Sequence, residues 1–213
     1  MEIKKKFSTQ KLVLTAIMTS LVIVFQVVGM FPVSTFAAAF ALIPIIVGAI
    51  LLGPYIGAWL GFIFSIVALL TPSTWGFLTI DPFATIVIVL LKGTACGYVS
   101  GLAYKLLTRV NEIFATFIAA FVCPVVNTGI FILGGIMFLT DDLAILTDGK
   151  YEGLNGAATW LWGLAAINFV LEFSLCVFIA PVIKKIIDIY KDRKYKKKHH
   201  KHHHHHHDED ADK

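Results

Sequence analysis

Charged residues are scarce over most of this chain. Between Leu12 and Ile183 only eleven Asp, Glu, Lys or Arg residues occur, and the others are confined to the first eleven residues and to the stretch after Ile183. Only 15% of the chain is charged, whereas a soluble domain carries about a quarter charged residues. A helix that crosses a bilayer needs about 20 mostly apolar residues. We therefore expect an all-α membrane protein with six transmembrane helices in one bundle.

Breaks in the apolar sequence divide it into these six spans. Proline cannot continue a helix, so Pro32 and the Gly53-Pro54 pair end the first two spans. The segment from Thr71 to Pro82 predicts a loop with an interfacial tryptophan. The predicted spans cover residues 11–30, 36–52, 55–70, 83–107, 113–139 and 157–183, between a basic segment at 1–10 and a charged, His-rich tail at 184–213 that we expect to be disordered or in part an affinity tag.

Lysine and arginine predict the orientation of the bundle. With six spans, the basic N-terminal segment, the turn holding Lys105 and Arg109, and the tail beginning at Lys184 all fall on one side. The loops on the other side carry five carboxylates against a single Lys150. Because positive charge stays cytoplasmic, we expect both termini in the cytoplasm and a multi-pass protein of the plasma membrane.

The sequence contains no motif typical of a resident cofactor or metal in the membrane domain. All eight histidines lie between His199 and His207, where a tag or a solvated tail is the simpler interpretation, although such a tract can bind transition metals. A subunit of a transition-metal importer therefore stays an alternative. Cys96, Cys123 and Cys176 stand alone in apolar runs, and we interpret them as small packing residues.

Small residues recur at four-residue spacing in three predicted helices. Such residues let helices touch closely in lipid, where little hydrophobic force drives them together. We expect the glycines to pack helices inside this domain, whereas the first-span residues either pack internally or dock a helix of a partner. The glycine series are Gly53, Gly57 and Gly61, and Gly93, Gly97 and Gly101, and the first-span residues are Thr15, Ala16, Thr19 and Ser20.

Polar side chains at membrane depth mark the candidate binding site. Lys92 and Glu172 are the only ionisable residues well inside a predicted span, and each costs at least about 2.5 kcal/mol to insert. At 1.5 Å per residue, Lys92 lies about 13 Å from the outer end of its helix. Asn127 and Asn168 fall at a similar depth, with Glu172 one turn deeper than Asn168. We predict a pocket here, open to the outside beneath residues 140–156.

Each of these residues also has a simpler explanation. Trp160 and Trp162 stand near the predicted rim and either stack on a ligand or belong to an interfacial belt. Asn127 either faces the pocket or satisfies carbonyls freed by Pro124. Lys92 and Glu172 could pair only with each other. A buried cation among amides suits a ligand that carries a carboxylate.

Several function classes are disfavoured. The chain has no Gly-x-x-x-x-Gly-Lys-Ser/Thr phosphate loop, so it cannot power transport with ATP by itself. Without histidines or paired aspartates in the spans, an intramembrane metalloprotease is disfavoured. An intramembrane enzyme would have to use Lys92 with Glu172, and a scaffold would leave no cavity at their level. We assign no catalytic residue.

The chain resembles the substrate-binding S components of energy-coupling factor (ECF) vitamin transporters, over about residues 8–190. The resemblance rests on the basic start, the first span beginning Lys11-Leu-Val-Leu-Thr-Ala-Ile, the polar outer loop before the last span, and the stretch Ile43-Pro-Ile-Ile-Val-Gly-Ala-Ile-Leu-Leu-Gly-Pro-Tyr-Ile-Gly-Ala-Trp-Leu-Gly. It implies a non-enzymatic subunit without cofactor or nucleic acid that binds a vitamin from outside. The partners implied are membrane lipid, a transmembrane coupling subunit and two ATPases.

The resemblance also assigns roles to particular residues. It implies that Thr15, Ala16, Thr19 and Ser20 dock the coupling subunit, and that the whole subunit topples in the membrane to release its substrate. The family pocket is built from the outer halves of the last three helices, where Lys92, Asn127 and Asn168 lie. Lys92 favours an anionic vitamin such as pantothenate, while riboflavin and a pyrimidine or pyridoxine precursor stay open.

Overall fold

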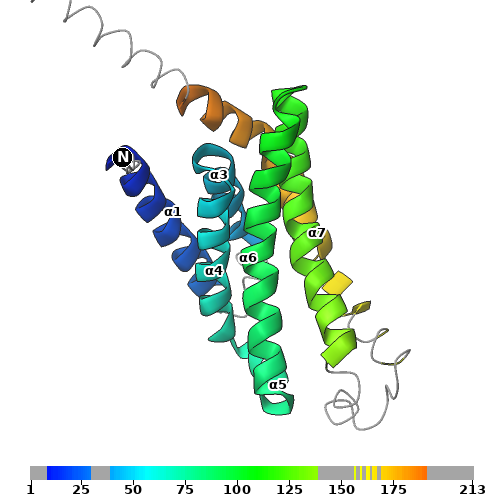
Figure 1. Cartoon of the computed structure of the whole chain (residues 1–213). Coiled ribbons are helices and arrows are strands. Elements are labelled where there is room, and N and C mark those ends of the chain that lie inside the picture. The colour runs from blue at the N-terminus through cyan, green and yellow to red at the C-terminus, as the bar shows by residue number, and fades with distance from the viewer. Residues whose placement is uncertain are drawn as a thin grey trace, which may run out of the picture.

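A computed structural model describes residues 9–29, 39–138, 156, 159, 162–163, 165–166 and 169–190 of the chain, and no strand occurs among them. Six helices are labelled in Figure 1, and residues 169–190 form a further helix that we call the C-terminal helix. The labelled helices are α1 (Thr9–Val28), α3 (Leu42–Leu52), α4 (Pro54–Leu69), α5 (Pro72–Ile80), α6 (Pro82–Leu107) and α7 (Glu112–Phe138). The expectation of an all-helical fold is therefore confirmed for the described residues.

Among the described residues, three helices are long and apolar enough to cross a membrane, namely α1, α6 and α7. A fourth crossing results if α4 and the part of α5 from Thr74 to Ile80, which meet at a bend of 77°, are taken together. Helix α3 is apolar but only 11 residues long. The chain is a multi-pass helical membrane protein in this description. The count of six spans and the cytoplasmic location of the termini stay predictions.

The expected loop between Thr71 and Pro82 is wrong, because most of it forms helix α5. Both prolines that suggested a loop stand at the first position of a helix, Pro72 in α5 and Pro82 in α6. Proline is favoured there, since its fixed φ suits the helix and its missing N–H is not needed. The Asp81 side chain also accepts a hydrogen bond from the Ala84 N–H at 3.0 Å and so caps α6.

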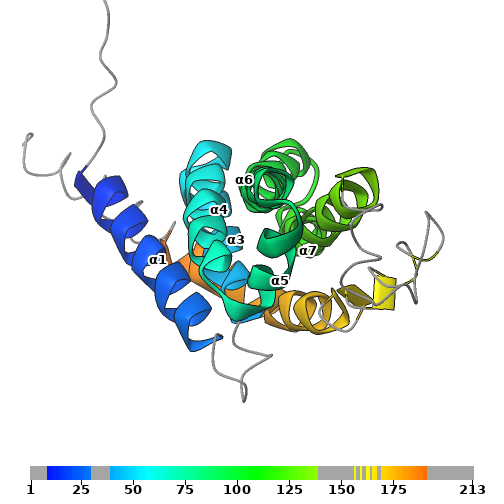
Figure 2. The ribbon, with the colours of Figure 1, turned by 90° about the horizontal axis from the view of Figure 1, so that it is seen from below.

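The corner between α4 and α5 is closed by threonines. The hydroxyls of Thr71 and Thr74 both donate to the Ala68 carbonyl, at 2.6 and 2.8 Å. This satisfies a carbonyl at the end of α4 that has no partner in its own helix. Phe77 of α5 then packs into a small buried cluster with Ile88 of α6, so α5 is fixed against the end of the bundle (Figure 2).

Helices α4 and α6 run antiparallel with their backbones in contact. Gly57 faces Gly97, and Gly61 faces Gly93. A Cβ added at any of these four positions would overlap an atom of the facing helix, in each case including a carbonyl oxygen. We call these four residues the glycine seam. The predicted role of the glycines in internal packing is confirmed here.

Gly53 lies in the turn between α3 and α4 and has a φ of 104°. This backbone conformation is open to glycine and strained for other residues. Gly101, at the end of α6, packs against the Pro54 backbone in the same turn. The Gly53-Pro54 pair therefore ends one helix, begins the next and brings the turn against α6.

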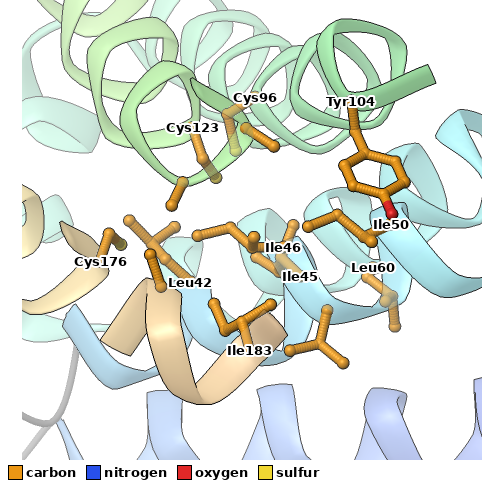
Figure 3. Close-up of a cluster of buried hydrophobic side chains, with 14 of the residues drawn as sticks. Leu42, Ile45, Ile46, Ile50, Leu60, Cys96, Tyr104, Cys123, Cys176 and Ile183 are labelled. Atoms are coloured by element: carbon orange, nitrogen blue, oxygen red, sulfur yellow. The ribbon is translucent and has the colours of Figure 1, made fainter. Parts of the chain in front are cut away.

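Helix α3 lies at the centre of the bundle. Leu42, Ile45 and Ile46 are fully buried, and in Figure 3 their side chains lie among Cys96, Cys123, Cys176 and Ile183. All three cysteines are free thiols inside the main hydrophobic cluster. Our interpretation of them as packing residues is confirmed.

One end of the bundle gathers the basic residues of the described chain apart from Lys92. The start of α1, the α3–α4 turn, the α6–α7 turn and the last residues of the C-terminal helix lie at this end (Figure 1), which we call the basic end. The C-terminal helix continues to residue 190, past the Ile183 boundary that we expected. Helix α5 lies at the opposite end.

Candidate functional site

The predicted polar residues on α7 and the C-terminal helix are in direct contact. The side-chain amide of Asn127 donates a hydrogen bond to Oε2 of Glu172 at 3.2 Å. Asn127 is only 4% exposed, and its Oδ1 is buried without a hydrogen-bond partner in the described part of the structure. A buried acceptor left unmet usually costs about 1–3 kcal/mol. The site therefore holds an acceptor that a ligand or a water molecule could use.

Lys92 reaches the same region from α6. Its ammonium lies 4.9 Å from the centre of the Phe131 ring on α7, a cation–π contact. Its charge also attracts that of Glu172, yet the two form no salt bridge among the described residues. The alternative that Lys92 and Glu172 serve only to pair with each other is therefore not the arrangement seen, because Lys92 keeps donors available.

The alternative explanation for Asn127 also differs from the structure. Pro124 lies inside α7 and lacks an N–H, which leaves the Ala120 carbonyl without its usual partner. The Asn127 amide nevertheless donates to Glu172 and not to a carbonyl of its own helix. Asn127 thus links two helices at the candidate site.

Each of these polar residues stands four positions from a buried cysteine. Lys92, Asn127 and Glu172 form a polar layer, and Cys96, Cys123 and Cys176 form a thiol layer one helical turn closer to the basic end. The Cys96 thiol donates a hydrogen bond to the Gly93 carbonyl at 3.1 Å. Since all three cysteines are fully buried, the thiol layer separates the polar layer from the basic end.

Two predicted site residues, Trp160 and Asn168, lie outside the described residues, as do residues 140–155 of the expected roof. Trp162 is described and is 59% exposed, which suits both a pocket rim and an interfacial belt. The roles of these residues stay predictions.

Gln26 is a buried polar residue that our sequence reasoning missed. It lies near the end of α1, is 5% exposed, and has an Oε1 atom without a hydrogen-bond partner among the described residues. The same signal that marked Asn127, a side-chain amide at membrane depth, could have identified Gln26. Because Gln26 is uncharged, it was not singled out with Lys92 and Glu172.

The small residues of α1 are only partly covered by the rest of the bundle, with Thr15 and Thr19 half-buried. The hydroxyls of Thr15, Thr19 and Ser20 donate to carbonyls of their own helix at 2.8, 2.8 and 3.0 Å. Ala16 and Ser20 are exposed, and the only fully buried side chains of α1 are Val22 and Gln26. Most of α1 is therefore free to meet lipid or another helix.

The described residues contain no group of three or more His, Cys, Asp or Glu side chains placed to hold a metal ion. The histidines at 199–207 lie outside the described residues.

A bundle of apolar helices that encloses a polar layer defines a membrane-embedded binding or transport protein. The family model described as ECF transporter, substrate-specific component matches residues 10–184 of the chain. The chain therefore belongs to the family of substrate-specific components of ECF transporters, which are transport subunits that bind small-molecule substrates and work with a coupling subunit and ATPases. No curated protein and no solved structure matches it.

Proposed function

We propose that this subunit captures an anionic, water-soluble vitamin from outside the cell and delivers it through a coupling subunit and two ATPases. Two observations in the polar layer carry the proposal. Among the described residues, the Lys92 ammonium has no carboxylate bound to it, and the buried Oδ1 of Asn127 has no hydrogen-bond partner. A cation and a hydrogen-bond acceptor in the same layer suit a ligand that carries an anionic group and a hydrogen-bond donor.

The polar layer suits one chemical pattern in particular. Lys92 can donate to a carboxylate, and such charge-assisted hydrogen bonds are stronger than neutral ones. Asn127 Oδ1 and the Glu172 carboxylate can accept from hydroxyl or amide N–H groups. Pantothenate combines a carboxylate with an amide and two hydroxyls, so it is our favoured substrate. A neutral flat vitamin such as riboflavin would depend more on Trp160 and Trp162.

A thermal-stability screen of the purified chain against water-soluble vitamins tests the function. A ligand at 100 times its Kd adds about 2.7 kcal/mol of stability to the folded state. We expect the largest shift with a vitamin that carries a carboxylate. If no vitamin shifts the unfolding temperature, the proposed function is wrong.

Comparing a charged with a neutral ligand then distinguishes a loss of the Lys92 charge from a general loss of the folded binding site. Lys92→Met should weaken binding of the carboxylate ligand by about 10- to 150-fold, from the 1.5–3 kcal/mol of a hydrogen bond to a charged group. Binding of a neutral analogue, in which an alcohol replaces the carboxylate, should change much less. Lys185→Met, an exposed lysine at the basic end, is the control. Equal losses for both ligands would refute the charge role.

We also propose that the outward face of α1 docks the coupling subunit, because Ala16 and Ser20 let another helix approach closely. Ala16→Phe should block assembly with the coupling subunit and ATPases while leaving vitamin binding intact. Val24→Phe adds similar bulk at another exposed position of α1 and should disturb assembly less. Full co-purification of the Ala16→Phe variant with its partners would count against this assignment.

A further inference from the structure

A cavity opens at the basic end, apart from the polar layer. It lies where the α3–α4 turn meets the end of α6 and has a volume of about 470 Å³. Its wall from α3 and the turn is apolar, whereas the last turn of α6 contributes polar side chains. The lining residues from α6 and its end are Gly101, Tyr104, Lys105, Thr108 and Arg109.

The cavity follows from the close approach of the backbones beside it. The Gly53-Pro54 turn packs on Gly101, and neither glycine carries a side chain that would fill the space above the contact. Leu51 and Leu52 end α3 along the opposite wall. The result is an apolar hollow in the region where the helices end.

Two positive charges stand at this hollow. Lys105 lies in the last turn of α6 and Arg109 two residues beyond its end. Both line the cavity, and both are exposed. Among the described residues neither forms a salt bridge, and the nearby Glu112 is held by Lys184 at 3.4 Å and by the Tyr104 hydroxyl at 3.5 Å.

The end of α6 does not cancel these charges. A helix C-terminus carries a partial charge of about −0.5, against two full positive charges from Lys105 and Arg109. The net field at the cavity mouth is therefore positive, and it favours an anion.

Exposed aromatic rings flank the cavity. Tyr55 follows the lining residue Pro54, Tyr98 lies one turn before Gly101, and their ring centres are 5.8 Å apart. Tyr55 is 79% exposed. Tyrosines gather at the level of lipid headgroups, which places the cavity mouth at the membrane interface.

We propose that this cavity binds an anionic phospholipid, with Lys105 and Arg109 at its phosphate and the apolar wall of α3 along its acyl chain. The apolar wall distinguishes this occupant from a free phosphate, and the two cations distinguish it from a neutral lipid. Basic pockets between helices at a membrane surface are a known form of lipid headgroup site. The inference does not depend on which vitamin the subunit carries.

The test measures lipid retention by native mass spectrometry of the full chain titrated with phosphatidylglycerol or phosphatidylcholine. Each basic residue near an anionic surface contributes about fivefold in affinity, so Lys105→Gln with Arg109→Gln should weaken phosphatidylglycerol binding about 25-fold. The control Lys11→Gln with Lys185→Gln removes the same charge from exposed positions at the same end, and it should change binding less than twofold. Lys105→Arg with Arg109→Lys keeps both charges and should retain the lipid.

Competition identifies the source of the phosphate. A short-chain phosphatidylglycerol should displace the bound lipid, whereas inorganic phosphate or glycerol phosphate at the same concentration should not. Three results would each overturn the proposal. They are equal retention of the two phospholipids, equal losses in the two glutamine double variants, and displacement of the bound lipid by inorganic phosphate. The vitamin-induced thermal shift of each variant reports its folding independently.

Discussion

The glycine seam predicts opposite effects for the same substitution at two helix positions. At Gly61 an added methyl group would overlap the Gly93 backbone, whereas at Gly129 of α7 nothing lies within 4 Å of the added Cβ. Replacing glycine by alanine inside a helix normally stabilises it by about 0.5–1 kcal/mol. This gain applies at both positions, so the difference in stability between the two variants measures the cost of the steric overlap at Gly61.

The expected difference is large enough to measure. Overpacking costs about 1–3 kcal/mol, and the upper part of this range applies because the obstacle is backbone and not a side chain that can rotate. We expect Gly129→Ala to unfold at a higher temperature than Gly61→Ala. The gap should be about 4–12 °C, from about 2–3 kcal/mol of overpacking at about 2–4 °C per kcal/mol for a protein of this size.

The assay is equilibrium unfolding of both variants in mixed detergent micelles, checked by thermal scanning without added vitamin. Circular dichroism before unfolding shows whether both variants keep the helical content of the original chain. If Gly61→Ala were as stable as Gly129→Ala, the backbone contact between α4 and α6 would not exist as described.

Three further outcomes follow from the structure. Ser100→Ala should lower the free energy of unfolding by about 0.6 kcal/mol, a typical value for a hydrogen bond between membrane helices, because its hydroxyl donates to Ala119 on α7 at 2.8 Å. Ser65→Ala should cost less, since the Ser65 hydroxyl bonds within its own helix, and equal losses in chemical unfolding would contradict this assignment. The three buried cysteines should react with a maleimide only upon unfolding, and rapid labelling of the native protein, read by mass spectrometry, would disprove the thiol layer. Deleting residues 199–207 should leave uptake of the vitamin unchanged in cells, and loss of uptake would revive the metal-importer alternative.

Sequence patterning predicted the long helices α1, α6 and α7, but it predicted a loop where the short helix α5 forms. Runs of apolar residues bounded by charge or proline mark α1, α6 and α7 because both lipid and the protein core exclude charge. The same proline signal failed at Pro72 and Pro82, since a proline is equally suited to a loop and to the first position of a helix. The packing of Phe77 on Ile88 holds α5 against α6, and no local pattern encodes that contact.

For the candidate site, the sequence predicts a depth for each polar residue but not which side chains bond to each other. Counting residues from the helix ends places Lys92 and Asn127 at one height and Glu172 one turn deeper, whereas in the structure Asn127 bonds directly to Glu172. It does not give the rotation of each helix about its axis, so the bond from Asn127 to Glu172 could not be distinguished from a Lys92–Glu172 pair. The lipid cavity was not foreseen, because it arises from the shape left between a turn and a helix end.

The glycine seam also limits which mutations can repair one another. When two side chains collide in a protein core, a smaller residue on the partner helix often restores the fit. At Gly61 and Gly93 the partner has no side chain left to reduce, so no replacement at the facing position can compensate for added bulk. A genetic screen for suppressors of Gly61→Ala should therefore recover changes at neighbouring contacts such as Phe64 or Ser65, or none at all, and never a change at Gly93.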